Sequence, residues 1–339
     1  MNDDLNEIID NEQAEEGSEL YEHIRMTVDP GQQPERIDTY LTNHLSNISR
    51  NRVQNAAKAG NILVNEKAVK QNYKVKPGDT ISIVFTYPPR DADIKPEDIP
   101  LNIVYEDDDV IVINKQAGLV VHPGHGNFEH TLLHGLAYHF EQTHQNIENR
   151  FGYLVHRIDK DTTGLMIVAK NEAAQAVLAH QFFEHTIHRR YYALVWGDFD
   201  EEEGTIEGNI GRSVNDRRKM TVYPNGDYGK DAITHWRVLE RFGYVTLNEY
   251  RLETGRTHQI RVHLSSRGHA LVGDKVYVKS KKTELMLPEP LKSEVNHFAR
   301  QALHAKSLGF EHPRSGQWLQ FDSQLPADMQ NLLALLADN

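Results

Sequence analysis

The fold of this chain is decided by the stretch Tyr153-Leu154-Val155-His156-Arg157-Ile158-Asp159-Lys160-Asp161-Thr162-Thr163-Gly164-Leu165-Met166-Ile167-Val168-Ala169-Lys170. Apolar runs flank a cluster of His, Arg, Asp and Thr, which predicts a strand, a polar turn and a second strand. A carboxylate between two buried strands is costly unless it is compensated. We therefore expect Asp159 to be paired with a cation, or hydrogen-bonded by the Thr162 and Thr163 hydroxyls and nearby N–H groups. Gly164 suits the turn by which the backbone re-enters the sheet.

The composition is that of a globular chain. Its 339 residues are 39% hydrophobic and 25% charged, and this length suggests two or three domains. There are no cysteines, which excludes disulfides and thiolate zinc sites and fits a cytoplasmic protein. The N-terminus lacks the basic and apolar regions of a signal peptide, and no apolar run approaches the ~20 residues that span a bilayer. A membrane protein is therefore not expected.

The negative charge is unevenly distributed along the chain. The net charge is −12, but residues 1–24 hold nine Asp or Glu and no Lys or Arg, so the remainder carries only −3. We interpret residues 1–24 as an acidic disordered tail, which is either simply solvated or an electrostatic mimic that discourages off-target binding. Residues 34–86 hold eight Lys or Arg and four Asp or Glu. This local excess of positive charge is compatible with a nucleic-acid partner.

Residues 34–86 predict a small module of two helices and a short sheet. Apolar residues at helical spacing follow residue 35, Ser49 and Gly60 are suited to begin and end a second helix, and the apolar runs 62–64 and 80–85 predict strands. The basic residues around the second helix are Arg50, Arg52, Lys58 and Lys67. Such a face can meet phosphates, although an ordinary solvated face is the alternative.

A Pro- and Asp-rich linker at residues 87–100 leads to a larger domain that we place at residues 101–330. Short apolar runs at 103–105 and 110–113 predict a hairpin, and residues 201–230 predict a second hairpin excursion. The basic residues of that excursion are Arg212, Arg217, Arg218 and Lys219. Such a basic loop suits a phosphate backbone, and a solvated loop is the alternative.

Histidines in the larger domain raise the question of a metal. His130 and His134 have the i, i+4 spacing of metal ligands, and His139 follows. No Glu comes directly after His130, as the zinc-protease pattern requires. Helix-surface and capping roles are therefore favoured, and no metal site is predicted.

Two further segments, like the central stretch, combine apolar residues with a cluster of polar and charged ones. Arg189-Arg190-Tyr191-Tyr192-Ala193-Leu194-Val195-Trp196-Gly197 predicts a strand, with Tyr191 and Tyr192 on opposite faces. Thr254-Gly255-Arg256-Thr257-His258-Gln259-Ile260-Arg261-Val262-His263 predicts a turn and the start of a helix, where anions bind readily. Together with His-Arg-Ile-Asp-x-x-Thr-Thr-Gly at 156–164, these segments resemble the three motifs of the RluA/RluD family of RNA pseudouridine synthases. The resemblance covers residues 34–325 in order, and its first part resembles an S4 RNA-binding domain.

The resemblance implies an α+β fold, with an S4 module followed by a catalytic domain whose mixed, mainly antiparallel sheet is flanked by helices. It implies isomerisation of uridine to pseudouridine without cofactor or metal. Asp159 would be the essential carboxylate, either attacking C1′ or removing a sugar proton, with Arg256 as its partner and Tyr191 against the uracil. The target base would be flipped out of the RNA, which would also be contacted by Arg157 and Arg261. The implied partner is 23S ribosomal RNA or the precursor of the large ribosomal subunit.

Other hypotheses remain open at this point. The substrate could be transfer RNA, or the chain could be a non-catalytic RNA-binding ribosome-assembly factor that keeps the fold. A glycoside hydrolase needs two cooperating carboxylates, and Asp161 is close to Asp159 in sequence, but a turn neighbour need not face the same site. A monomer is the simplest expectation for the oligomeric state.

Overall fold

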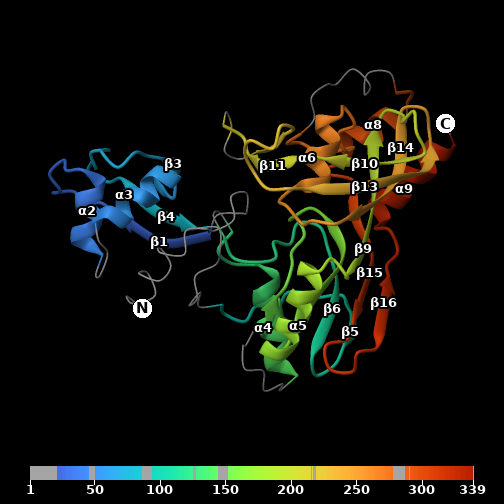
Figure 1. Ribbon diagram of the computed structural model, residues 1–339, viewed down its shortest axis with the longest axis horizontal. Helices are drawn as coiled ribbons and strands as arrows, with labels where there is room; N and C mark the ends of the chain where they lie inside the picture. Colours follow the sequence, from blue (N-terminus) through green and yellow to red (C-terminus); the bar gives the residue numbers. More distant parts are fainter. Residues whose placement is uncertain are drawn as a thin grey trace. The chain divides into compact units, whose positions relative to one another are not determined.

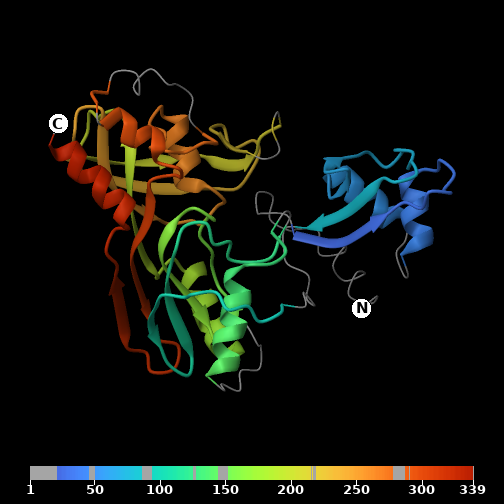
Figure 2. The same cartoon turned by 180° about the vertical axis from the view of Figure 1, so that it is seen from behind.

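The computed structural model describes residues 21–45, 50–85, 94–124, 127–143, 152–214, 216, 219–277, 287–289 and 291–338. The chain forms two compact units. The first comprises residues 1–93 and 123–128, and the second comprises residues 94–122 and 129–339. The ribbon is drawn in Figure 1 and from behind in Figure 2. No helix in the described ranges has the length and apolar character needed to cross a membrane.

The first unit contains two helices and a small antiparallel sheet with the strand order β1-β4-β2-β3. Its elements are β1 (Tyr21–Thr27), α2 (Ile37–His44), α3 (Arg50–Ala59), β2 (Ile62–Val64), β3 (Lys67–Ala68) and β4 (Thr80–Phe85). The helical face that the sequence predicts is confirmed, because Ile37, Tyr40 and Leu41 are buried in the core of this unit. Gly60 (φ 79°) follows the last residue of α3 in the left-handed conformation that ends many helices. Ser49 lies outside the described residues.

Two boundaries differ from those the sequence suggests. Residues 21–24, which the sequence places in the acidic tail, belong to β1 and pair antiparallel with β4. Alternation of Ile24 and Met26 against the core outweighs the acidic character of the neighbouring residues. Residues 94–100, the second half of the predicted linker, belong to the second unit, where Ile94 is buried. The remainder of the tail and of the linker lies outside the described part of the chain.

The second unit is built on one sheet with the order β10-β13-β14-β9-β15-β8-β6-β5, to which β16 is added beside β15 and β7 beside β8. Its strands are β5 (Ile103–Glu106), β6 (Val110–Lys115), β7 (Tyr153–Leu154), β8 (Thr163–Ala169), β9 (His188–Trp196), β10 (Glu203–Glu207), β13 (Ile233–Arg241), β14 (Val245–Leu252), β15 (Leu303–Glu311) and β16 (Trp318–Asp322). The pairing of β8 with β15 is parallel, and the other pairings of this sheet are antiparallel. The predicted mixed, mainly antiparallel sheet is therefore confirmed.

Helices cover this sheet at both ends. They are α4 (Leu132–Gln142), α5 (Glu172–Phe183), α6 (Gln259–Ser266), α8 (Leu291–His297) and α9 (Ala327–Ala337). Both views show α4 and α5 side by side at the end of the sheet that holds β5 and β6, and α8 and α9 near the end that holds β14. A separate hairpin of β11 (Asn209–Arg212) and β12 (Met220–Tyr223) lies in the predicted excursion.

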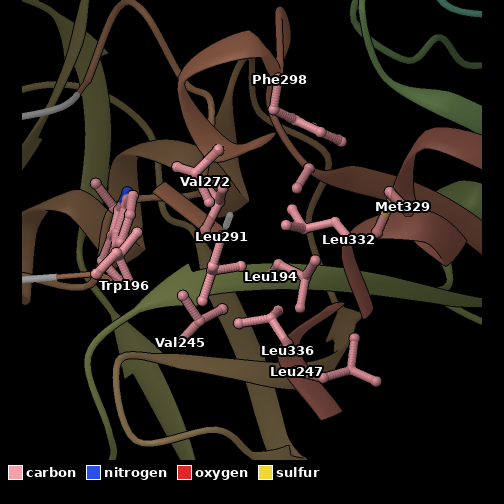
Figure 3. Packing of buried hydrophobic residues seen from close by; sticks show 14 residues of the cluster. Leu194, Trp196, Val245, Leu247, Val272, Leu291, Phe298, Met329, Leu332 and Leu336 are labelled. Atoms are coloured by element: carbon pink, nitrogen blue, oxygen red, sulfur yellow. The ribbon is translucent and has the colours of Figure 1, made fainter. Parts of the chain in front are cut away.

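Alternation along β9 separates two cores. On one face, side chains of the sheet meet α8 and α9, as Figure 3 shows for Leu194, Val245, Leu247, Leu291, Met329, Leu332 and Leu336. On the other face, Tyr191, Ala193 and Val195 pack with Ile260 and Leu264 of α6. Since residues 191–196 alternate between the faces, Tyr192 packs on the side opposite to Tyr191, as the sequence predicts. This arrangement brings α6 onto the same side of the sheet as Tyr191.

Gly164 lets β8 approach β15 closely. Its φ of +111° is available to glycine, and a Cβ at this position would overlap the backbone oxygen of Ala305. Glycine is therefore required here both by conformation and by space.

Replacing Gly164 by Ala is expected to lower the free energy of unfolding by about 3 kcal/mol or more, since backbone strain adds to the overlap with Ala305. Gly118→Ala is the matched control, because Gly118 has a φ of +80° but nothing within 4 Å of its Cβ position. That variant should lose only about 1–2 kcal/mol. Urea unfolding would measure both, and equal losses would contradict the role of the close approach.

Candidate active site

Asp159 lies in the turn between β7 and β8. The backbone N–H of Thr162 donates to the Asp159 carbonyl at 3.1 Å, which closes the turn. Upstream, His156 Nε2 accepts the N–H of Ile167 at 3.0 Å, so this histidine is neutral. Burial and the nearby Arg189 charge lower the pKa of His156 to about 3. The turn is therefore closed after Asp159 by its own backbone, and is tied to β8 before Asp159 by His156.

The partner of the Asp159 carboxylate is Arg261 on α6. Arg261 Nη1 donates to Asp159 Oδ2 at 2.8 Å, while its Nε and Nη2 donate to the two oxygens of Asp274 at 2.7 and 3.1 Å. The side chains of Arg261 and Asp274 are 6% and 0% exposed, whereas that of Asp159 is 20% exposed. A buried guanidinium thus joins a fully buried carboxylate to one that solvent can reach.

This pairing corrects two expectations from the sequence. Arg256, expected to pair with Asp159, precedes α6 and donates its Nε to the backbone oxygen of Asp231 at 3.0 Å. Arg261, expected to contact RNA, is buried between two carboxylates and is not available to a phosphate. The hydroxyls of Thr162 and Thr163 are also engaged elsewhere, with Gln301 and His304. The negative charge of Asp159 is therefore compensated by a cation, and not by the two threonine hydroxyls, which were the other alternative in the sequence analysis.

The surroundings keep Asp159 ionised. Burial by itself would raise the pKa of this carboxyl, but the nearby His258, Arg261 and Arg157, with the hydrogen bond from Arg261, hold its pKa below the usual range. His258 Nε2 lies 3.9 Å from Asp159 Oδ2, the oxygen that also accepts from Arg261. A partly accessible, ionised carboxylate is suited to act as a nucleophile or as a base.

Tyr191 lies close to this carboxylate from β9. Its side chain is buried in the core shared with α6. Burial raises the pKa of Tyr191, the Asp159 charge raises it further, and the Arg189 guanidinium opposes them. The phenol is therefore neutral, and the charge of Asp159 helps to keep it so.

Lys115 at the end of β6 is a residue that the sequence did not single out. Its side chain is fully buried. Its Nζ donates to the backbone oxygens of Gln116, Leu119 and Lys160, each at 2.9 Å. Because Lys160 follows Asp159, this amine anchors the turn that carries the carboxylate. Burial lowers the pKa of Lys115 to about 7, against the charges of Asp159 and Asp161 that raise it.

A depressed lysine pKa makes stability depend on pH. Below the folded pKa of about 7 the amine is charged in both states, and the cost of burying the charge is fully present. As pH rises toward the unfolded value of about 10.4, the folded state releases its proton first and becomes relatively more stable. Compared with Lys115→Met, the wild type should therefore gain roughly 2 kcal/mol of unfolding free energy between about pH 7 and about pH 9. Urea unfolding at both values would test this, and a constant difference would contradict it.

The predicted RNA-binding residues lie in separate places. In the first unit, Arg50, Lys58 and Lys67 are exposed, and Arg50 Nε donates to Asp38 at 3.2 Å. In the second unit, Arg157 lies in the Asp159 turn, Arg212 is the last residue of β11, and Lys219 immediately precedes β12. The side chain of Arg52, and Arg217 and Arg218 altogether, fall outside the described part of the chain.

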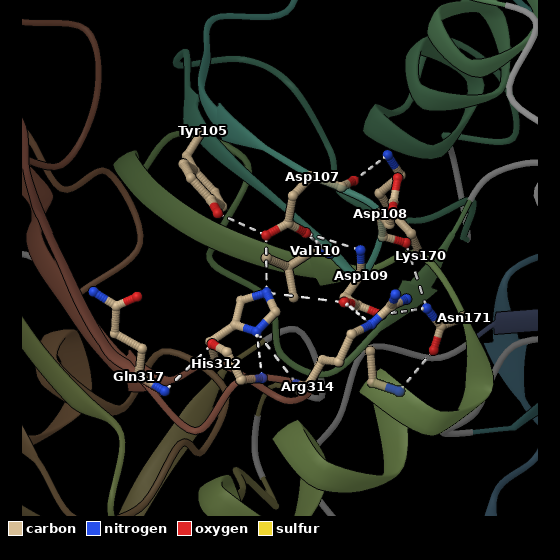
Figure 4. A network of polar contacts seen from close by, with 12 residues as sticks. Tyr105, Asp107, Asp108, Asp109, Val110, Lys170, Asn171, His312, Arg314 and Gln317 are labelled. Carbon is tan, nitrogen blue, oxygen red and sulfur yellow. Dashed lines mark hydrogen bonds and ion pairs between the residues drawn. The ribbon is translucent and has the colours of Figure 1, made fainter.

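The histidines considered as metal ligands have other roles. His134 forms a capping box with Thr131 at the start of α4, as the capping interpretation predicts. Elsewhere in the described ranges, one group could hold a metal ion by distance: Asp107, Asp109 and His312. Figure 4 shows that internal partners contact this group. They are Tyr105, Asn171 and Arg314.

The site also contains residues that sequence reasoning missed. Asp274, His258 and Tyr277 surround Arg261 and Asp159, and the ring of Tyr277 lies 5.1 Å from the Arg261 guanidinium carbon. His258 stands inside the third motif, and Gly273-Asp274 resembles a later segment of the family, but neither position by itself indicates a contact at this site. Tyr277 carries no such signal.

Comparison with known proteins identifies the class of protein. Residues 109–266 match the model of the RNA pseudouridylate synthase family, and residues 35–81 match the S4 domain. The chain is 46% identical over 319 residues to an uncharacterized RNA pseudouridine synthase of Chlorobaculum parvum, covering 91% of this chain and 96% of that protein. A solved structure titled human RNA pseudouridylate synthase domain containing 1 is similar, with 26% identity, a TM-score of 0.52, and coverage of 71% of this chain and 96% of that one. The chain therefore belongs to the RNA pseudouridine synthase family.

The names of other relatives specify the large ribosomal subunit. A protein of Zymomonas mobilis named ribosomal large subunit pseudouridine synthase D is 44% identical over 305 residues, which cover 89% of this chain and 93% of the relative. A protein of the same name from Nitrosomonas europaea is 44% identical over 311 residues, which cover 91% and 87%. The chain is thus an RNA-binding isomerase that resembles enzymes named for the large ribosomal subunit.

Proposed function

We propose that this enzyme converts specific uridines of 23S ribosomal RNA to pseudouridine, with Asp159 as the essential carboxylate. The observation that carries the proposal is the state of Asp159, which is partly exposed and is held ionised by a buried arginine at 2.8 Å. Arg261 takes the role of partner that was expected of Arg256. The name of the relatives that share 44% identity supports the large-subunit target.

The reaction is an isomerisation within the nucleotide. The bond between C1′ and N1 breaks, the uracil turns, and C1′ joins C5. The C5 proton then leaves and N1 carries a proton, so no atoms are gained or lost. Asp159 either attacks C1′ or removes a sugar proton, and both routes need the ionised carboxylate that Arg261 stabilises.

The substrate base must be flipped out of folded RNA to reach Asp159. The ring of Tyr191 would then pack against the uracil face, and its hydroxyl would assist removal of the C5 proton. Arg157, in the same turn as Asp159, would contact a phosphate or occupy the space that the base leaves. The detached uracil is thereby held while C1′ is transferred.

RNA outside the target nucleotide would be bound by positive charge in both units. We assign this role to Arg50, Arg52, Lys58, Lys67, Arg212, Arg217, Arg218 and Lys219. The matched segments 35–81 and 109–266 fall inside the ranges that we propose for the S4 domain, residues 34–86, and for the catalytic domain, residues 101–330. We further propose that the enzyme acts as a monomer in the cytoplasm.

Pseudouridine mapping tests the substrate directly. Ribosomal and transfer RNA would be mapped from cells that lack the gene and from the same cells complemented with wild type or Asp159→Asn. Loss of modification at discrete 23S uridines, restored by wild type alone, is the expected result. Loss confined to transfer RNA would overturn the ribosomal target, and restoration by Asp159→Asn would overturn the catalytic role.

A further inference from the structure

A second imidazole lies beside Asp159. His258 immediately precedes α6 with a φ of 56°, in the left-handed region. Its Nδ1 lies 2.7 Å from the hydroxyl oxygen of Tyr277, and its Nε2 lies 3.9 Å from Asp159 Oδ2. The two ring nitrogens therefore face different partners, one of them the proposed catalytic carboxylate.

The hydrogen bond that Tyr277 accepts from Met220 favours one tautomer of His258. The backbone N–H of Met220 donates to the Tyr277 hydroxyl oxygen at 3.0 Å, so that oxygen already acts as an acceptor. The phenolic proton is then directed to His258 Nδ1, at 2.7 Å. An imidazole that accepts at Nδ1 carries its proton on Nε2, the nitrogen nearest to Asp159.

We propose that His258 is a positioning residue for Asp159, held by Tyr277 in the tautomer that presents its Nε2–H to the carboxylate. The proposal rests on the proposed catalytic role of Asp159. It adds a second set of groups to the Arg261 guanidinium that acts on this carboxylate. In this set, Met220 contacts Tyr277, Tyr277 contacts His258, and His258 faces Asp159.

The electrostatics agree with this geometry. Burial would raise the pKa of Asp159, and His258 and Arg261 both lower it. The neutral tautomer of His258 acts through its Nε2–H, on the nitrogen that lies 3.9 Å from Asp159 Oδ2. The other charged or titratable groups that interact with Asp159 come from several elements: Arg157 in its own turn, Lys115 at the end of β6, Tyr191 on β9, and Arg261 and Tyr277 near α6. Without His258, the carboxyl should take up a proton at a higher pH.

The pH dependence of the reaction separates this role from a structural one. Protonation of Asp159 stops the reaction, so the acidic limb of the rate profile reports its ionisation. Removing His258 should move this limb upward by about one pH unit, since an N–H donor directed at a carboxylate lowers its pKa by that order. Well above the limb, the rate should fall much less, because Asp159 is then ionised in either protein.

Three variants of the full-length enzyme distinguish the role of His258 from a structural one. His258→Asn suits a positive φ and can still meet Tyr277, but its amide is too short to reach Asp159. Tyr277→Phe keeps the ring beside Arg261 and removes only the hydroxyl that orients His258. His185→Asn is the control, since His185 has the same φ of 56° and is exposed in the turn after α5.

The measurement is the single-turnover rate of pseudouridine formation across the acidic and neutral range, on an unmodified 23S transcript. The expected result is an upward shift of the acidic limb in His258→Asn, a smaller shift in Tyr277→Phe, and no shift in His185→Asn. An unchanged profile in His258→Asn, or an equal loss of rate at every pH, would overturn the proposal while Asp159→Asn remains inactive. Activity in Asp159→Asn would instead overturn the proposed function, and the role of His258 with it.

Discussion

Asp159→Asn is expected to lower the single-turnover rate of pseudouridine formation by about 10³-fold or more, because an amide can neither attack C1′ nor accept a sugar proton. The fold should be retained. Arg261 keeps its two hydrogen bonds to Asp274, so no buried charge is left unpaired. RNA binding should be unchanged or slightly tighter, since the variant carries one negative charge fewer near the backbone phosphates.

The measurement pairs product formation with RNA binding on the same transcript. Asp161→Asn is the control, because Asp161 lies in the same turn and carries the same charge. It should keep nearly full activity. If Asp161→Asn were as inactive as Asp159→Asn, two cooperating carboxylates would be indicated and the single-carboxylate mechanism would fail.

Arg261→Met is expected to remove both activity and stability. Asp274 is fully buried and loses its partner, which should cost about 3–5 kcal/mol of unfolding free energy. Asp159 loses the guanidinium that lies 2.8 Å away and becomes easier to protonate. Arg256→Met should cost less than about 1 kcal/mol, because Arg256 donates one hydrogen bond to a backbone oxygen.

A double variant separates the two effects of Arg261. Arg261→Met with Asp274→Asn removes both buried charges, while the Asn oxygen can still accept the N–H groups of Val276 and Tyr277. Urea unfolding should show that most of the lost stability returns. Activity should stay low, because Asp159 still lacks its partner. Recovery of activity in the double variant would show that Arg261 acts only through stability.

Local patterns in the sequence predicted much of the fold. Helical spacing placed Ile37, Tyr40 and Leu41 in the core of the first unit, and alternation placed Tyr191 and Tyr192 on opposite faces of β9. These predictions succeed because the side chains of a helix repeat every 3.6 residues and those of a strand every two residues, so the buried face can be found within a single element. The same reasoning misplaced residues 21–24, whose strand exists only because β4 pairs with it.

The sequence by itself determined the family, the order of the two domains, and the carboxylate in the turn between two strands. Only the tertiary structure decided which arginine meets that carboxylate. Arg256 and Arg261 stand in one motif, but the pairing of Arg261 with Asp159 spans 102 residues and depends on how α6 lies against the turn. The anchoring of the turn by Lys115, and the contacts of His258 with Tyr277 and Asp159, were likewise decided by packing between elements. Contacts of this kind leave no periodic pattern in the sequence, because they join residues that are far apart along the chain. Their energy comes from burial and from electrostatic attraction.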